Sequence, residues 1–434
     1  MSKLHTRIYT WQEVNCKDGK LNPEKWIVID NEVYDVTNWG RKHPGGSRVM
    51  THYAGQDASE AFTAFHKNQK YARKFMKALH IGRVESTVTN RNQSVIKDVL
   101  NLRQTAEKMG LFTASKLFYV VHALQIILLI VSGYFLMYYF GVTMATYTLA
   151  IFILGTAQAQ AAWLQHDFGH NSVFKNNKWN RLVHFLIMGT LKGASSKWWT
   201  HMHNQHHSKP NVIGKDPDVR LEALFVVGEK MPVDVAKNGK SKMPYNHQHK
   251  YFMIIGPPLL FPVYFQFMLF WYILTRKEWS DLFFTLSFYV LFGAVFGSLM
   301  SWWKVILLYE GMRVLESIWF TWVAQANHIP MEIDKDLQRP WLELQLKATC
   351  NIEKSVFNDW FTGHLNFQIE HHLFPCMPRH NLHRIAPLVK SVCRKHDIEY
   401  RVKTLSEGLT DILRSLHKSG QIWFDAYYHL RHDL

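Results

Sequence analysis

The first part of the chain combines short strand-like patterns with one amphipathic helical pattern. WIVID (26–30) and VYDV (33–36) read as short, partly alternating strands, and the polar pair between them is typical of a turn. DASEAFTAFH (57–66) instead repeats its apolar residues with a helical period. Residues 1–85 are therefore predicted to fold as a small α+β domain.

Four later stretches are long and free of charged residues. Residues 117–140, 144–165, 251–275 and 282–303 contain no Asp, Glu, Lys or Arg. Each is long enough to cross a hydrocarbon core, which takes ~20 mostly apolar residues. We therefore predict about four transmembrane helices, the third of them kinked near its start by prolines.

A fifth apolar stretch differs from these four because it carries charge. Residues 305–325 hold Glu310, Arg313 and Glu316 at a spacing of three, which places a narrow charged stripe on one face of a helix. We interpret this stretch as interfacial or packed against protein, and not as a membrane span.

Polar residues of mixed charge separate the first domain from the apolar stretches. Residues 86–116 are predicted to be a linker and a helix that leads into the membrane, and 117–434 an all-α membrane domain. The long segment between the second and third spans is rich in Lys and Arg, so the positive-inside tendency places it in the cytosol. With two spans on either side of it, both termini are expected to be cytosolic as well. A further span at 305–325 would carry the C-terminal part to the opposite face.

Overall composition limits the classes of molecule that the chain is expected to bind. The formal net charge is +16, and 47% of the residues are hydrophobic. Such a basic chain meets nucleic acid, an anionic membrane surface or an anionic substrate. The predicted spans favour membrane lipid, and we expect no nucleic-acid partner. The four cysteines form no CxxC pair, which indicates reduced thiols instead of a disulfide framework or a zinc site.

Three histidine-rich stretches recur far apart in the chain. They are HDFGH (166–170), HNQHH (203–207) and QIEHH (368–372), called here the first, second and third box. Spacings of three and four place the members of each box on one helix face. Seven histidines exceed the four ligands of a tetrahedral zinc ion and suit two metal ions. The chain lacks the ExxH pair of carboxylate-bridged di-iron bundles. The candidate ligands are His166, His170, His203, His206, His207, His371 and His372.

The order of the boxes, with membrane spans between them, resembles that of membrane fatty acyl desaturases. The resemblance implies two non-haem iron ions, held by the seven histidines in a cytosolic cap of the membrane domain, and makes these histidines the catalytic residues. A third box that begins with glutamine is similar to the front-end subgroup. That subgroup inserts a double bond between an existing one and the carboxyl end of the chain.

The same resemblance implies further metal contacts. The family has a ligand histidine outside the boxes, and His328 in QANHIP is the candidate. Gln368 offers an amide oxygen, which is a weaker ligand than imidazole. It is expected to bind an iron ion weakly, to bind through water, or to shape the site. The sequence does not choose among these roles.

A second resemblance concerns the first domain. HPGG (43–46) predicts a tight turn that fixes His43, and AFTAFH ends at His66. The segment that joins them is similar to cytochrome b5, which implies that His43 and His66 bind haem b. Two axial histidines leave the haem iron with no open position, so such a haem transfers electrons.

Together, these resemblances predict an oxygen-dependent front-end desaturase of the endoplasmic reticulum membrane. Its expected substrate is a polyunsaturated acyl-CoA, into which it inserts a cis double bond using O2 and electrons from its own haem domain. The electron donor is expected to be NADH-cytochrome b5 reductase, because the chain has no GxGxxG loop for a nucleotide.

Several alternatives stay open from the sequence. A haem-fused sphingolipid desaturase also fits a third box that begins with glutamine. A lipid hydroxylase and a non-catalytic membrane electron carrier are further alternatives. Regioselectivity, chain length and the choice of acyl-CoA or phospholipid are not determined. Four lysines near the second box are candidates for binding acyl-CoA phosphates, although lysines in such a segment also face water or headgroups: Lys192, Lys197, Lys209 and Lys215.

Overall fold

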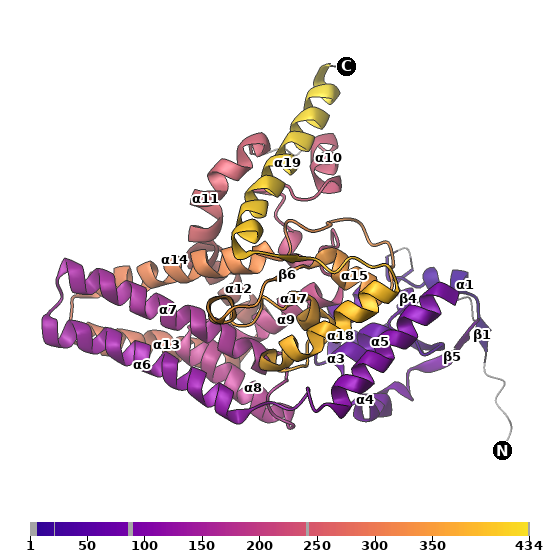
Figure 1. Cartoon of the computed structure of the whole chain (residues 1–434), viewed down its shortest axis with the longest axis horizontal. Helices are drawn as coiled ribbons and strands as arrows, with labels where there is room; N and C mark the ends of the chain where they lie inside the picture. The colour runs from indigo at the N-terminus through magenta and orange to yellow at the C-terminus, as the bar shows by residue number, and fades with distance from the viewer. Residues whose placement is uncertain (1–6, 21, 86–89, 240–242, 433–434) are drawn as a thin grey trace.

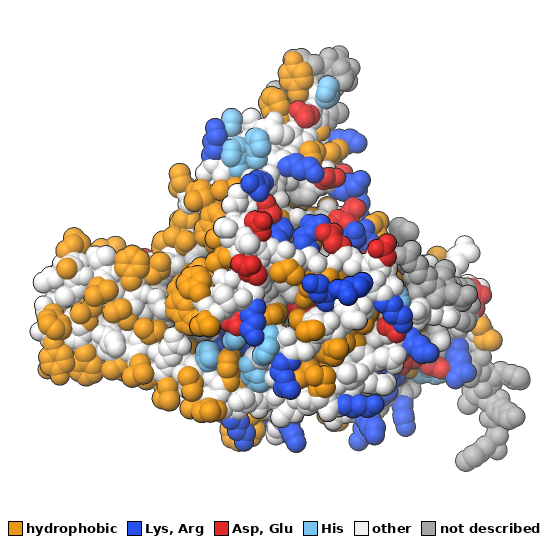
Figure 2. Space-filling view, in the orientation of Figure 1, with side chains coloured by type: hydrophobic (Ala, Val, Ile, Leu, Met, Phe, Trp, Pro, Cys, Tyr) orange, Lys and Arg blue, Asp and Glu red, His pale blue; other side chains and the backbone are white. Residues whose placement is uncertain are grey.

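An N-terminal α+β unit packs beside a mostly helical body, from which four long helices project to one side (Figure 1). The computed structural model describes residues 7–20, 22–85, 90–239 and 243–432, with the backbone alone described at 90–92 and 430–432. Hydrophobic side chains cover the projecting helices, whereas charged side chains gather over the rest of the visible face (Figure 2).

The N-terminal unit contains a five-stranded sheet in the order β1-β5-β3-β2-β4. The predicted strand pair is confirmed: β2 and β3 are antiparallel and joined by Asp30 and Asn31, both with positive φ. The predicted helix is also confirmed as α3. The strands are β1 (Ile8–Tyr9), β2 (Trp26–Ile29), β3 (Glu32–Asp35), β4 (Gln56–Asp57) and β5 (His80–Val84), and the helices are α1 (Trp11–Asn15), α2 (Ser47–His52), α3 (Ser59–Phe65) and α4 (Gln69–Met76).

Helix α5 (Asn90–Lys108) joins this unit to the helical body without standing free of either. Its residues Val95, Val99 and Leu102 are buried in one hydrophobic cluster. The same cluster contains Phe62 of the N-terminal unit and Ile385 of the body. The part of the expected linker at 86–89 lies outside the described residues.

The projecting helices form two hairpins, α6 (Lys116–Phe140) with α7 (Met144–Gly169) and α13 (Trp279–Gly297) with α14 (Trp302–Ala326). Their turns lie at the same end of the molecule (Figure 1). There, Tyr147 of α7 donates a hydrogen bond to the carbonyl of Lys304 at 2.6 Å. At the opposite ends of the hairpins, α7 carries the first box and α14 ends just before His328.

Two of the predicted spans have different bounds in the structure. Residues 282–303 do not form one helix, because α13 ends at Gly297 and a turn precedes α14. The stretch 251–275 is broken into α11 (Gln248–Leu259), a π-helical turn (Leu260–Phe265) and α12 (Gln266–Arg276). The expected kink is thus confirmed, and the prolines inside and after α11 account for it.

The residues that follow the broken segment lie against the helix that carries the second box. Glu278 binds Lys197 near the start of that helix. Asp281 likewise accepts hydrogen bonds from Ser195 and Ser196.

Length and composition identify three helical segments that are apolar enough to cross a membrane. Among the described residues these are Lys116–Phe140, Tyr245–Arg276 and Trp279–Gly297. Helix α14 does not meet this criterion because of its charged stripe, of which Arg313 and Glu316 are packed against protein. Arg313 and Glu316 are buried and 2.5 Å apart, and Glu316 also binds the buried Lys192.

Short helices cover the inner ends of the two hairpins and carry the second and third boxes. These elements are α8 (Asn177–Phe185), a π-helical turn (Leu186–Leu191), α9 (Ser196–Ser208), α10 (Lys230–Lys237), α15 (Trp341–Ala348), β6 (Asn351–Ile352), α16 (Val356–Phe361), α17 (Gln368–Leu373), α18 (Leu382–Lys395), β7 (Val402–Lys403) and α19 (Leu405–His432).

Candidate metal centre

The three boxes, which are distant in sequence, meet in the interior of the helical body. The first box lies at the end of α7, the second on α9 and the third on α17. Their side chains sort into two groups of potential ligand atoms, each with atoms within 4.8 Å of one another. The first histidine group is His166, His170, His203, His207 and His371, and the second histidine group is His206, His328 and His372.

Helical spacing explains how the boxes divide between the groups. In each box the residues four apart stay together, as His166 with His170 and His203 with His207. In the second and third boxes, one residue lies between the two that are four apart and belongs to the other group. It is His206 in the second box and His371 in the third. One helix therefore contributes to both groups, which brings them into contact: the His207 and His372 rings stack at 4.2 Å between centroids.

The nitrogen atoms of the first histidine group converge as they would around a cation. His203 Nε2 lies 3.1 Å from His166 Nε2 and 3.0 Å from His207 Nε2. A single proton on His203 can be donated to only one of these neighbours. His170 Nε2 and His371 Nε2 are buried and have no hydrogen-bond partner among the described residues. Buried nitrogen atoms of this kind fit a bound metal ion.

The second histidine group is oriented by hydrogen bonds on its outer side. His206 Nδ1 lies 2.9 Å from Asp216, His328 Nδ1 lies 3.1 Å from the carbonyl of Ala348, and His372 Nδ1 lies 3.0 Å from Gln345 Oε1. These bonds place the proton of His328 on Nδ1 and leave Nε2 free as a ligand. Such outer contacts are typical of metal-binding histidines.

Gln368 lies beside the second histidine group. Its side-chain nitrogen is 2.9 Å from His328 Nε2 and 3.5 Å from His372 Nε2. Its Oε1 is buried without a hydrogen-bond partner in the described part of the chain. Rotation of the amide would point this oxygen at the two imidazoles, so the position suits a weak fourth ligand.

The electrostatic state of most of these histidines also suits a metal. Burial lowers the pKa of His328 to about 3, so its imidazole is neutral at pH 7. Burial also lowers the pKa of His206, but Asp216 and Asp218 outweigh it and raise the pKa to about 9. Binding of a metal by His206 would therefore release a proton. Burial holds the pKa well below its usual range for His170, His203, His207, His371 and His372.

His43 and His66 form a separate pair in the N-terminal unit. Their ring centroids are 6.1 Å apart, which leaves room for one metal ion at the roughly 2 Å typical of metal–imidazole bonds. His43 Nδ1 lies 3.3 Å from the carbonyl of Gly46 and His66 Nδ1 lies 2.9 Å from that of Phe62. Both Nε2 atoms are thereby left for a metal, which fits a haem iron between two axial histidines.

The turn that holds His43 lies against the helix of the second box. A Cβ atom on Gly45 would come within 3.0 Å of His43 Cε1 and 3.9 Å of Asn204 Nδ2. Gly46 has a φ of +95°, and a Cβ atom there would lie 3.4 Å from His201 Nδ1. The positive φ favours glycine at position 46, and the distances to Asn204 and His201 show that the turn packs against α9.

Side chains fasten this contact next to the first histidine group. His52 Nδ1 lies 2.9 Å from Ser208 Oγ, and Tyr53 donates a hydrogen bond of 2.7 Å to the carbonyl of Ser208. Ser208 directly follows His207. His52, to which the sequence assigned no role, thus lies where the N-terminal unit meets the body.

The polar residues inside the boxes do not face water. Asp167 accepts hydrogen bonds from the Tyr119 hydroxyl and the backbone of Arg379. Glu370 accepts hydrogen bonds from Asn351 at 2.8 Å and Tyr400 at 2.7 Å.

The structure does not support the four lysines as binders of phosphate. Each pairs with a carboxylate: Lys192 with Glu316, Lys197 with Glu278, and both Lys209 and Lys215 with Asp336.

Sequence reasoning missed the residues that support the ligands from outside. Asp216 and Gln345 orient ligand histidines from positions 10 and 27 residues away along the chain. A lone aspartate and a lone glutamine carry no spacing signal, so only the fold reveals their role.

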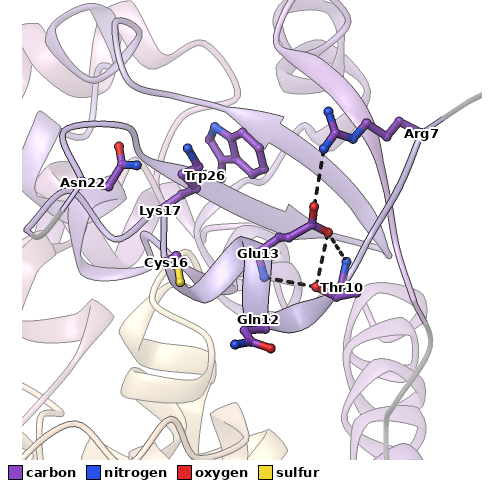
Figure 3. Close-up of a pocket in the computed structure, with 8 residues that line it drawn as sticks. All are labelled: Arg7, Thr10, Gln12, Glu13, Cys16, Lys17, Asn22 and Trp26. Atoms are coloured by element: carbon purple, nitrogen blue, oxygen red, sulfur yellow. Dashed lines mark hydrogen bonds and ion pairs between the residues drawn. The ribbon is translucent and has the colours of Figure 1, made fainter.

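The N-terminal unit also has a surface hollow away from these groups. It is lined by residues between Arg7 and Trp26, none of them histidine. Its carboxylate, Glu13, is held by Thr10 and Arg7 in a helix cap (Figure 3). The hollow therefore contributes nothing to the metal centre. The four cysteines, including Cys16 at this hollow, are free, as predicted.

Comparison with known proteins matches two parts of the chain to known families. Residues 142–404, more than half of the 434 residues, match the family described as fatty acid desaturase. Residues 10–85 match the family described as cytochrome b5-like heme/steroid binding domain. Among solved structures, the chain is similar to the cytochrome b5 of Ostreococcus tauri virus 2. The identity is 25% over 18% of this chain and 95% of that chain, with a TM-score of 0.16.

Proposed function

Because the chain belongs to the fatty acid desaturase family and carries an N-terminal cytochrome b5-like domain, we propose that it is a front-end desaturase of polyunsaturated acyl-CoA. The observation that carries the proposal is the pair of adjoining histidine groups, with Gln368 in the place of a further histidine. The fatty acid desaturase family supplies the reaction, and the glutamine supports the front-end type.

The two histidine groups would each hold one iron ion. In this assignment the first group supplies five imidazoles, and the second supplies three imidazoles and the Gln368 amide. When bound, the irons would supply the oxygen activation that breaking an unactivated C–H bond requires. Overall, two hydrogens leave adjacent methylenes, and O2 is reduced to two waters with two electrons and two protons from outside.

The chain's own residues provide the setting for this reaction. Burial of the histidines excludes bulk water from the centre. Asp216, Ala348 and Gln345 hold the ligand rings in place. The N-terminal domain, with His43 and His66 as haem ligands, would bring electrons to the α9 side of the centre. Their source would be a separate reductase such as NADH-cytochrome b5 reductase.

We further infer four membrane crossings in the endoplasmic reticulum, made by α6, α7, α13 and α14. This assignment replaces the interpretation of 305–325, which lies in α14, as a stretch that does not span the membrane. The pairing of Glu278 with Lys197 supports this arrangement, because it keeps the broken segment 248–276 on the side of the boxes. Both termini and all boxes would then be cytosolic. A glycosylation acceptor inserted at 298–301 should be modified, and one inserted at 277–280 should not. The reverse pattern would contradict this topology.

Product analysis after expression in yeast tests the activity. Cells fed C18 to C22 polyunsaturated acids should gain a double bond between the carboxyl end and the existing ones, with its position read by mass spectrometry. The His203→Ala variant should abolish the product and keep haem absorbance. The His43→Ala variant should lose haem absorbance and keep non-haem iron. A new hydroxyl, a change confined to sphingolipids, or no altered lipid would each contradict the proposal.

A further inference from the structure

Arg379 is a buried cation whose hydrogen-bonding capacity is unused. Its side chain is 2% exposed, and its three guanidinium nitrogens have no hydrogen-bond partner among the residues that the structure describes. A guanidinium carries five N–H donors in a planar fork, and unpaired donors in a protein interior are costly. The four lysines near the second box all have carboxylate partners. Arg379 is therefore a better candidate for ligand binding.

The surroundings of Arg379 balance its charge without using its donors. Asp167 is the nearest carboxylate, at 3.8 Å from Arg379 Nε, which is too long for a hydrogen bond. The Phe118 ring lies 5.3 Å from Arg379 Cζ. His364 lies 5.5 Å from the same ring, and its buried Nδ1 also lacks a hydrogen-bond partner in the described residues. An arginine and a histidine with unsatisfied polar atoms thus flank one phenylalanine.

The position of this pair links the metal centre to the membrane helices. Asp167 directly follows His166 of the first histidine group. Phe118 lies in the first turn of α6, beyond which apolar side chains such as Leu124 and Leu128 are exposed. A group bound by Arg379 would therefore lie one carboxylate away from a candidate ligand and close to the start of α6, whose exposed side chains are apolar.

The charge balance selects the chemistry of that group. Asp167 already offsets the positive charge of Arg379, so a bound phosphate would leave net negative charge in a dry site, which is costly. A neutral carbonyl oxygen accepts hydrogen bonds without adding charge. We propose that Arg379, with His364 beside it, binds the ester or thioester carbonyl at the head end of the acyl substrate. This assignment rests on the proposed function and extends it to substrate anchoring.

Such an anchor also fixes where the double bond is introduced. A carbonyl held this close to the first histidine group places carbons only a few bonds from the carboxyl end at the metals. Arg379 then fixes the distance, measured from the carboxyl carbon, at which a front-end enzyme introduces the double bond.

A binding experiment on the purified full-length protein tests the anchor directly. Palmitoyl-CoA is compared with hexadecyl-CoA, a thioether that lacks only the carbonyl. A phospholipid with ester-linked chains is compared with its ether-linked counterpart. We expect about tenfold or more tighter binding of the carbonyl member in at least one pair, as for a hydrogen bond to a charged group. The pair that discriminates identifies the source of the carbonyl.

Variants assign the effect to the arginine. Arg379→Gln should reduce the preference to near one. Arg384→Gln, at an exposed arginine one turn of helix further on, should retain it. Haem absorbance and non-haem iron content establish that both variants are folded. Equal binding of both members in both pairs by the wild-type protein, or an undiminished preference in Arg379→Gln, would overturn the proposal. Failure of the desaturase assignment would instead appear as an absence of new double bonds in yeast.

Discussion

At the scale of single residues, His328 completes the second histidine group although it lies outside all three boxes. Because it is one of three imidazoles there, His328→Ala should lower non-haem iron from two toward one per chain and leave haem unchanged. His249→Ala is the matched control, since His249 pairs with His417 at the surface, outside both histidine groups. Metal analysis of the purified variants provides the measurement. Two irons retained in His328→Ala would remove His328 from the ligand set.

A second residue predicts a pH effect where the two domains meet. Burial raises the pKa of Glu60 to about 7, and its carboxylate accepts a hydrogen bond of 2.9 Å from the Trp341 backbone. A folded-state pKa above the unfolded one gives stability that is present below about 4.5 and is lost as pH rises through about 7. Glu60→Gln should therefore raise the thermal stability at pH 8.5, by on the order of 2 kcal/mol.

The same variant should differ little from the parent at pH 5, where Glu60 is mostly protonated in the folded protein. Glu24→Gln, which removes a surface ion pair with Lys17, is the matched control. Loss of haem absorbance on heating reports unfolding at each pH. A stability difference that is the same at both pH values would contradict the assignment.

Many of the candidate ligands in this site could be predicted from the sequence, because the spacing of residues within one helix is a local property. Spacings of three and four place His203, His206 and His207 on one helix face whatever the rest of the chain does. The division of these residues between two groups depends on how α9 is rotated against α7 and α17. That rotation is set by long-range packing, and so neither it nor the role of Asp216 could be predicted.

At the scale of elements, the stability of the folded protein should depend strongly on the buried charges of α14. Glu316 has no exposed surface and lies between two cations, Lys192 and Arg313. Glu316→Gln would leave both cations uncompensated, which typically costs about 3–5 kcal/mol for a buried pair. Thermal unfolding in detergent should show this loss. Glu310→Gln, at a partly exposed position six residues earlier, should change stability much less, and equal effects would contradict the argument.

The membrane helices show why hydropathy identified only part of the architecture. Helices α6 and α13 expose apolar side chains along their length and are recognised by composition. Helix α14 also exposes apolar side chains such as Ile306 and Leu307, but it buries polar groups whose partners come from elsewhere in the chain, such as Glu316 with Lys192. The prolines of 251–275 predicted the kink correctly, but composition does not report the course that the chain takes after such a bend.

At the scale of the whole molecule, Asp336 holds the cytochrome b5-like domain on the desaturase body. It accepts hydrogen bonds from Gln56 of the N-terminal domain at 2.9 Å and from Lys209 and Lys215 of the body. Burial raises the pKa of Asp336, but the two lysines outweigh it and hold the pKa well below its usual range. The carboxylate is therefore charged throughout the physiological pH range.

Asp336→Asn should slow reoxidation of the reduced haem by about tenfold or more, since losing one partner of a buried charge pair costs at least ~2 kcal/mol. Stopped-flow absorbance with substrate and O2 measures the rate, and the haem spectrum itself should not change. Asp234→Asn removes the surface ion pair with Lys335 and should have no effect. An unaltered reoxidation rate in Asp336→Asn would show that this contact does not hold the domains together.

The close fit of the HPGG turn against α9 has a kinetic consequence. A carrier that had to swing on a tether to reach its acceptor would slow in proportion to the viscosity of the medium. A haem domain that is already packed against the desaturase body does not have to diffuse to its acceptor. The rate of electron transfer within this protein should therefore not change when sucrose or glycerol is added. Only the rate of association with the external reductase should fall as the viscosity rises.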